Sequence, residues 1–130
     1  MAERIGSIKE LNVWVNAMDL GMEVFTKSKS FPPDERFSLT DQIRRSSRSV
    51  AANISEAWRK RRYPASFVSK LSDAESEAGE TRTWIEFARR CRYWSSEEAA
   101  RLEDQYEKVI GQLVKMIDQP DKWCLGLARS

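Results

Sequence analysis

Seven basic side chains near the middle of the chain have the chemistry of a phosphate-binding site. They are Arg44, Arg45, Arg48, Arg59, Lys60, Arg61 and Arg62. At about 100° per residue around a helix, the first four lie opposite the apolar residues of the same stretch. Guanidinium and ammonium groups on one face can contact successive phosphates of a nucleic-acid backbone. Trp58 and Tyr63 flank the last four, and we expect both rings to stack on unpaired bases.

A structural interpretation of the same charges stays open. The chain has a net charge of only +2, but residues 34–62 hold eight basic and four acidic side chains, whereas residues 96–118 hold three basic and six acidic ones. The basic face could therefore pair with the acidic segment of its own chain or of a neighbouring subunit. Nucleic-acid binding and subunit pairing are both compatible with this charge distribution.

Enzyme chemistry has little support in this sequence. The chain contains no histidine, which excludes the Glu-x-x-His ligand pairs of di-metal helix bundles and every histidine-dependent nucleophile. Glu75, Glu77 and Glu80 mostly point away from the apolar seam of their helix and are interpreted as a solvated face. Cys91 has arginines beside it, which favours its thiolate, but its place on an apolar stripe favours packing. We predict no catalytic residue, no metal and no cofactor.

Four amphipathic helices must position these residues. Apolar spacing predicts helices at about 8–29, 35–61, 65–92 and 96–117, followed by a short tail over 119–130. The clearest periodicity has a strict 4-3 spacing and comprises Phe67, Leu71, Ala74, Ala78, Thr81, Ile85 and Ala88. Pro32-Pro33, Tyr63-Pro64 and a capping box at 95–98 separate the helices. The pattern predicts one all-α domain, an antiparallel up-down-up-down four-helix bundle.

Two further apolar stripes are candidates for a subunit interface. Trp84, Phe87, Cys91 and Trp94 repeat at spacings of 3, 4 and 3 beside the main seam of the third helix. We assign these four to an oligomer interface, with the protomer core as the alternative. The first helix also carries two stripes, one through Met18 and Met22 and one through Ala17 and Leu20. Either this helix is central in the domain, or one of its stripes meets another subunit.

Composition and cysteine content predict a cytoplasmic protein. Charged residues make up 32% of the 130 residues and hydrophobic ones 41%, as in ordinary folded domains. The two cysteines, Cys91 and Cys124, lack metal-type spacing and are interpreted as reduced thiols. No apolar run approaches the length of a membrane span, and the first residues do not resemble a signal peptide. We therefore expect no membrane association.

A family resemblance is densest between residues 31 and 57. The matching residues are Phe31-Pro32, Glu35, Leu39, Gln42-Ile43-Arg44-Arg45 and Ser49-Val50-Ala51-Ala52-Asn53-Ile54-Ser55-Glu56-Ala57. They resemble the motifs FP-x-x-E-x-x-x-L-x-x-Q-x-R-R and S-I/V-x-x-N-I-A-E-G of the 23S rRNA intervening-sequence proteins, which are four-helix bundles. The match continues through Phe67, Leu71, Ala74 and Glu77. Two positions depart from the pattern: Ser55 replaces alanine and Ala57 replaces glycine.

The resemblance implies a bacterial, cytosolic homopentamer for which no firm biochemical activity is established. A related group, the accessory proteins of diversity-generating retroelements, binds nucleic acid and a reverse transcriptase. Carried onto this chain, the shared Asn53 and Glu56 are expected to have structural roles. Asn53 would bond to a neighbouring helix, and Glu56 would pair with an arginine.

These observations together predict a non-enzymatic homo-oligomer, pentameric by resemblance, that binds RNA or DNA through the basic face of its second helix. The alternative is a protein-protein adaptor or scaffold without a nucleic-acid role. Salt separates the two, because phosphate contacts weaken steeply as the salt concentration rises.

Overall fold

Four α-helices make up most of the computed structural model, which describes residues 6–125. They are α1 (Asn12–Ser28), α2 (Leu39–Arg59), α3 (Pro64–Arg90) and α4 (Ser96–Asp118). Three single 3-10 turns accompany them: η1 (Ile8–Glu10), η2 (Pro33–Glu35) and η3 (Pro120–Lys122). These residues contain no strand. The predicted all-α fold is confirmed.

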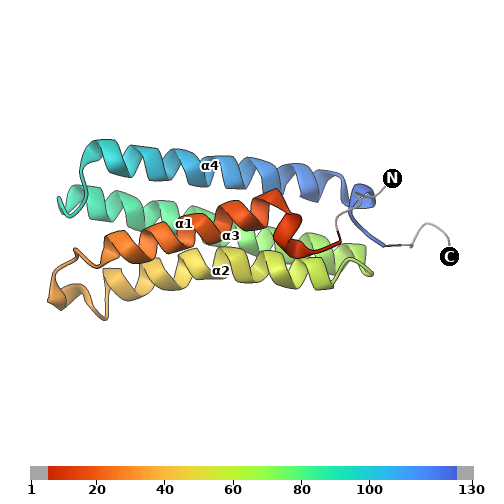
Figure 1. Cartoon of the computed structure of the whole chain (residues 1–130), viewed down its shortest axis with the longest axis horizontal. Helices are drawn as coiled ribbons and strands as arrows, with labels where there is room; N and C mark the ends of the chain where they lie inside the picture. Colours follow the sequence, from red (N-terminus) through yellow and green to blue (C-terminus); the bar gives the residue numbers. More distant parts are fainter. Residues whose placement is uncertain (1–5, 126–130) are drawn as a thin grey trace.

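The helices form a closed bundle in which neighbours along the chain are also neighbours in space. The colour order along each ribbon in Figure 1 shows that consecutive helices run in opposite directions. The second helix packs against α1 and α3, and the fourth packs against α3 and α1. This is the up-down-up-down arrangement expected for helices joined by short turns. None of the helices formed by residues 6–125 has the length and apolar content that a membrane crossing needs.

Two helices begin later than the periodicity predicts, because a separate turn precedes each of them. Residues 8–10 form η1, which Ser7 caps by accepting a hydrogen bond from the backbone of Lys9. Residues 33–35 form η2, and the Glu35 carboxylate accepts a hydrogen bond from the Leu39 backbone at 3.1 Å. The predicted starts at residues 8 and 35 are therefore wrong by four residues each.

The helix ends are set by local backbone chemistry. The third helix ends at Arg90 rather than 92 because Arg92 takes a left-handed conformation with φ of 65°. The second ends at Arg59 rather than 61. The fourth begins at Ser96, and Ser95 accepts a hydrogen bond from the Glu98 backbone at 3.1 Å. The serine half of the predicted capping box is therefore confirmed, whereas the Glu98 carboxylate pairs with Lys27 instead of returning the bond to Ser95.

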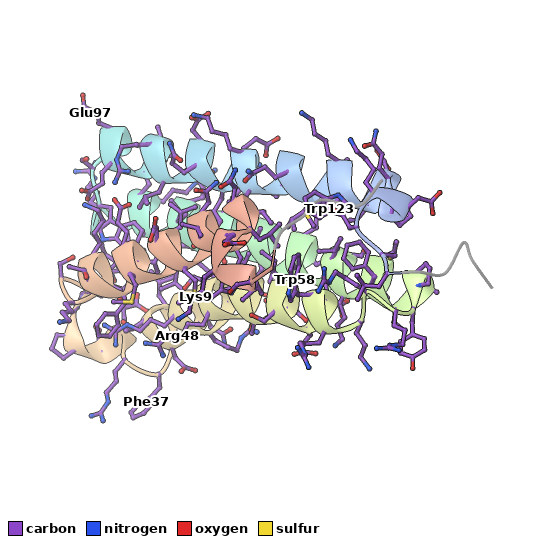
Figure 2. All side chains as sticks on the ribbon, turned by 45° about the vertical axis from the view of Figure 1, so that its right-hand side comes forward. Lys9, Phe37, Arg48, Trp58, Glu97 and Trp123 are labelled. Carbon is purple, nitrogen blue, oxygen red and sulfur yellow. The ribbon has the colours of Figure 1, made fainter. Side chains whose placement is uncertain are left out.

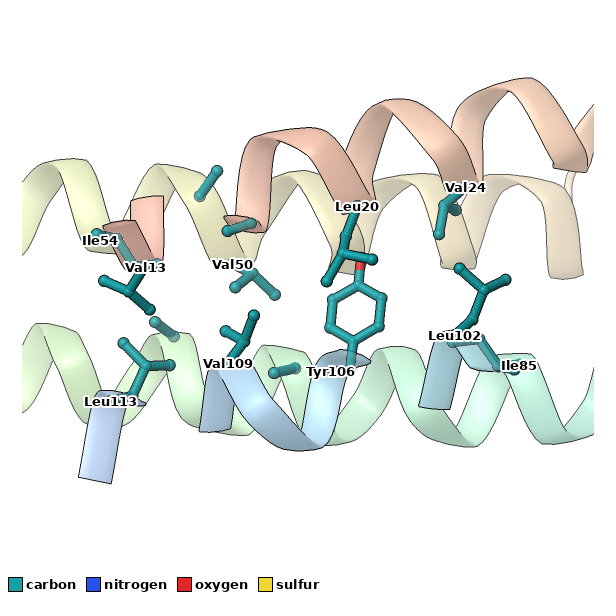
Figure 3. Packing of buried hydrophobic residues seen from close by; sticks show 14 of the residues in the cluster. Val13, Leu20, Val24, Val50, Ile54, Ile85, Leu102, Tyr106, Val109 and Leu113 are labelled. Carbon is teal, nitrogen blue, oxygen red and sulfur yellow. The ribbon is translucent and has the colours of Figure 1, made fainter. Parts of the chain in front are cut away.

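The predicted seam of α3 forms one wall of the core. All seven of its 4-3 residues are buried, as are six residues at matching spacing on α4: Ala99, Leu102, Tyr106, Val109, Leu113 and Met116. Figure 3 shows residues from all four helices meeting along the bundle axis. On α1, the stripe through Ala17 and Leu20 is buried, whereas Met18 and Met22 are exposed by 40% and 58%. The Ala17 stripe therefore belongs to the core, and the Met18 stripe remains a candidate for a contact with another subunit.

Tyr106 is the largest fully buried side chain, and its hydroxyl has no hydrogen-bond partner among the described residues. Burial, and to a lesser extent the charge of Glu23, raise the pKa of this hydroxyl, so the ring stays neutral at physiological pH. An unsatisfied buried hydroxyl costs about 1–3 kcal/mol of stability.

We therefore expect Tyr106→Phe to raise the free energy of unfolding by about 1 kcal/mol. Urea unfolding at fixed protein concentration, followed by circular dichroism, measures this change. Tyr106→Leu is the control, and it should destabilise the protein because it leaves a cavity. A lower free energy of unfolding in Tyr106→Phe would contradict this expectation and show that the hydroxyl makes a stabilising hydrogen bond.

Candidate nucleic-acid interface

Three cations, two from α2 and one from the residue that follows α1, converge on the ring of Phe25. The Arg44 and Arg48 guanidinium carbons lie 4.8 and 5.5 Å from the ring centroid, and the Lys29 ammonium lies 4.8 Å from it. We call these four residues the Phe25 cluster. None of its three cations takes part in the ion pairs formed among residues 6–125. The ring quadrupole attracts each cation, but the three positive charges repel one another, so the cluster favours an anion beside it.

Arg44 is held in place by a second contact. Its Nε donates to the Ser28 hydroxyl at 2.8 Å, and Ser28 is itself buried at the end of α1. The hydroxyl donates in turn to the Phe25 carbonyl at 2.9 Å. The Arg44 side chain is therefore positioned before any ligand arrives, which lowers the entropy lost on binding.

Arg45 points the other way, toward α3. Its guanidinium bonds to Glu77 at 3.4 Å and to Glu80, and Glu80 also accepts from the Trp84 indole at 3.0 Å. The hydrogen bond with Glu80, aided by the two negative charges, raises the pKa of Arg45. Since two carboxylates already compensate this charge, Arg45 contributes less to phosphate binding than its helical position alone predicts. The predicted basic face of α2 is therefore divided: Arg44 and Arg48 lie toward α1, and Arg45 lies toward α3.

A shallow hollow of about 620 Å³ lies over the start of α2. Its lining includes Arg36, Phe37, Asp41, Arg44 and Arg48. Figure 2 shows Phe37 projecting outward on the same side of the bundle as Arg48. Arg36 and Phe37 were missed from the sequence because they were placed inside a helix, and they lie instead in the turn between η2 and α2. The signal available for them was an arginine-aromatic pair that follows the proline pair after two acidic residues.

The second basic cluster lies near the other end of α2. Arg59, Lys60 and Arg62 are exposed. Fifteen residues separate Arg44 from Arg59, which is about 22 Å along a helix. Arg44 and Arg48 near the start of α2 and Arg59, Lys60 and Arg62 near its end therefore form two separate basic sites rather than one continuous face, and Arg45 belongs to neither because it turns toward α3.

Arg61 differs from its neighbours, since it covers Trp58. Its guanidinium carbon lies 3.6 Å from the indole centroid, and its Nε donates to the Trp58 carbonyl at 2.9 Å. Burial, and next the charge of Arg59, lower the pKa of Arg61. Trp58 is only 7% exposed, so the prediction that it stacks on bases is wrong. Tyr63, at 57% exposure, remains accessible.

The two shared polar residues of α2 have partners other than those expected. Asn53 donates to the Ser49 carbonyl of its own helix at 2.9 Å, rather than to a neighbouring helix. Glu56 pairs with Lys70 of α3 at 2.9 Å, rather than with an arginine. Asn53 is four residues from Ser49 and therefore reaches its carbonyl without leaving the helix. Both corrections leave these residues in structural roles.

The stripe assigned to an oligomer interface is divided between core and surface. Trp94 is buried, donates to the Lys27 carbonyl at 3.1 Å and packs against Phe31. Trp84 is half-buried and lies beside Phe87 with 5.8 Å between ring centroids. Phe87 is 50% exposed and Cys91 is exposed. Trp94 therefore belongs to the protomer core, and the exposed Phe87 and Cys91, with the half-buried Trp84 beside them, remain available for a contact between subunits.

An apolar hollow of about 310 Å³ between α1 and α2 is a second candidate for a subunit contact. Its lining includes the exposed Met18 and Met22 and the small residues Gly21, Ala51 and Ala52. Trp14 closes one side by donating from its indole to the Ser55 hydroxyl at 3.0 Å.

Within residues 6–125, no group of three or more His, Cys, Asp or Glu side chains is placed to hold a metal ion.

The comparisons with known proteins agree with this architecture. A family model described as 23S rRNA-intervening sequence protein matches residues 9–115. The fold is similar to the crystal structure of a protein with unknown function from the S23 ribosomal protein family of Bacteroides thetaiotaomicron, with a TM-score of 0.73 and 27% sequence identity. That likeness covers 81% of this chain and 97% of the other. No curated protein matches.

Proposed function

The chain belongs to the family of 23S rRNA-intervening sequence proteins, and we propose that it is a non-enzymatic homo-oligomer that binds RNA or DNA through the basic surface of α2. The observation that supports this proposal most is the Phe25 cluster, because its three cations lack a carboxylate partner in the described part of the chain. By contrast, the neighbouring cations Lys27 and Arg45 each meet carboxylates. Phosphate is the ligand that such a cluster fits.

The proposed contact uses the two ends of α2. Arg44, Arg48 and Lys29 would receive phosphates at one end, and Arg59, Lys60 and Arg62 at the other. Arg45 takes a smaller part because Glu77 and Glu80 compensate it. One protomer offers few contacts, so its affinity would be weak and strongly dependent on salt.

Assembly would strengthen this weak contact. We propose a pentamer, as the resemblance implies, in which five copies of the basic surface act on one nucleic-acid strand by avidity. Exposed apolar residues support assembly of some kind, because burying Met18, Met22 or Phe87 against a second subunit is favourable. The alternative function, an adaptor or scaffold, is favoured by the same apolar hollow between α1 and α2.

Salt dependence tests nucleic-acid binding directly. We expect the affinity for a labelled single strand, measured by fluorescence anisotropy over a series of KCl concentrations, to fall by about 0.7 log units per log unit of salt for each phosphate contact. Arg48→Gln should weaken binding and reduce that slope by about one contact. Arg45→Gln should have a smaller effect, because Arg45 is already paired.

Lys115→Gln on α4 is the matched control, since it removes one exposed positive charge outside both clusters. It should leave the slope unchanged. Absence of binding at low salt, or equal effects of the Arg48 and Lys115 substitutions, would contradict the proposal.

Assembly is tested by placing a charge on each candidate interface. Phe87→Glu should dissociate the oligomer if α3 forms the contact, and Met22→Glu should do so if the α1–α2 hollow forms it, because a buried unpaired carboxylate is costly. Sedimentation velocity measures the assembly state, and circular dichroism checks that the helices persist. If the wild-type protein sediments as a monomer, or if neither substitution changes its assembly, the proposed interfaces are wrong.

A further inference from the structure

Phe37 is the most exposed large apolar side chain of the described chain, at 82%. Leaving a phenyl ring in water forfeits the stabilisation that its burial would give. The ring does not pack against the hydrophobic core. The ring is therefore accessible to a ligand.

The backbone beneath Phe37 is firmly held. In the turn, the Ser38 backbone donates to the Glu35 carbonyl at 2.9 Å, and the Glu35 carboxylate accepts from Leu39. The same carboxylate accepts from the Tyr93 hydroxyl at 2.7 Å, which raises the pKa of Tyr93 to about 12. These bonds tie the turn to α2 and to the α3–α4 connection, so the ring is presented outward by ordered structure.

The charged side chains around Phe37 are mostly cationic, since four arginines line the hollow with it and only one carboxylate, Asp41, does so. The Arg36 guanidinium carbon lies 5.0 Å from the ring centroid, and Arg44 and Arg48 share the hollow with it. A protein partner with an apolar face would have to desolvate these guanidinium groups. A nucleotide instead offers a flat base for the ring and a phosphate for the arginines.

From this arrangement we infer that the hollow at the start of α2 takes single-stranded nucleic acid in preference to duplex, with one unpaired base stacked on Phe37 and the adjacent phosphates on Arg36 and Arg48. This inference rests on the proposed function and names its substrate class. Every base has a π-face that a phenyl ring can stack on, but in a duplex that face is covered by neighbouring bases. A duplex therefore gains only the arginine contacts.

The test compares a labelled single strand with the duplex of the same sequence, using wild-type protein and Phe37→Ala at low salt. Removing one stacked base should weaken single-strand binding by about tenfold and leave duplex binding unchanged. Phe37→Trp should retain single-strand binding because it keeps an aromatic ring. Since the side chain is exposed, neither substitution should alter the circular dichroism spectrum.

Two further binding measurements distinguish a failure of base stacking on Phe37 from a failure of nucleic-acid binding as a whole. Arg48→Gln should weaken single strand and duplex alike, because it removes a phosphate contact common to both. An abasic strand, which keeps the phosphates but lacks bases, should bind wild-type protein as weakly as the ordinary strand binds Phe37→Ala. If Phe37→Ala binds the single strand as well as wild type while Arg48→Gln binds both ligands less, the inference is overturned and the proposed function stands. If wild-type protein binds neither ligand, both are overturned.

Discussion

The rotation of α2 about its own axis decides which charges this protein presents. The helix is held between α1 and α3, with Ser46 and Ser47 buried in the contact. The Thr81 hydroxyl of α3 donates to the Ser46 hydroxyl of α2 at 2.8 Å. This buried hydrogen bond fixes the two helices relative to each other. With Ser46 turned inward, successive residues diverge: Arg45 reaches α3, whereas Arg44 and Arg48 reach α1. Small residues in the contact let α2 and α3 approach closely, so this rotation is set by packing.

That rotation separates charges that stabilise the bundle from charges that remain uncompensated. On the α3 side, Arg45 meets two carboxylates, and further along Glu56 meets Lys70. On the α1 side, the arginines meet the Phe25 ring and the Ser28 hydroxyl, neither of which cancels a positive charge. The net charge of the chain conceals this division. A protein near neutrality can therefore present a surface that favours polyanions.

Much of the fold could be predicted from periodicity, because burial repeats in register with the helix. The α3 seam and the α4 stripe are buried as their spacing requires, and so is the α1 stripe through Ala17. The site could be predicted only in part. Local spacing places arginines on a helix face, but their partners come from other helices and depend on the rotation of α2. The same limit applies to Trp58, which spacing leaves at a helix end and which the folded chain covers with Arg61.

We propose that this bundle assembles and uses its uncompensated cations to bind nucleic acid. Size-exclusion chromatography coupled to light scattering tests it most directly, with the protein alone and with a pool of RNA and single-stranded DNA, at low and at moderate salt. The account predicts the mass of five protomers for the protein alone, a larger mass with nucleic acid at low salt, and loss of that increase at moderate salt. A monomer, or an oligomer whose mass never changes when nucleic acid is added, would contradict it.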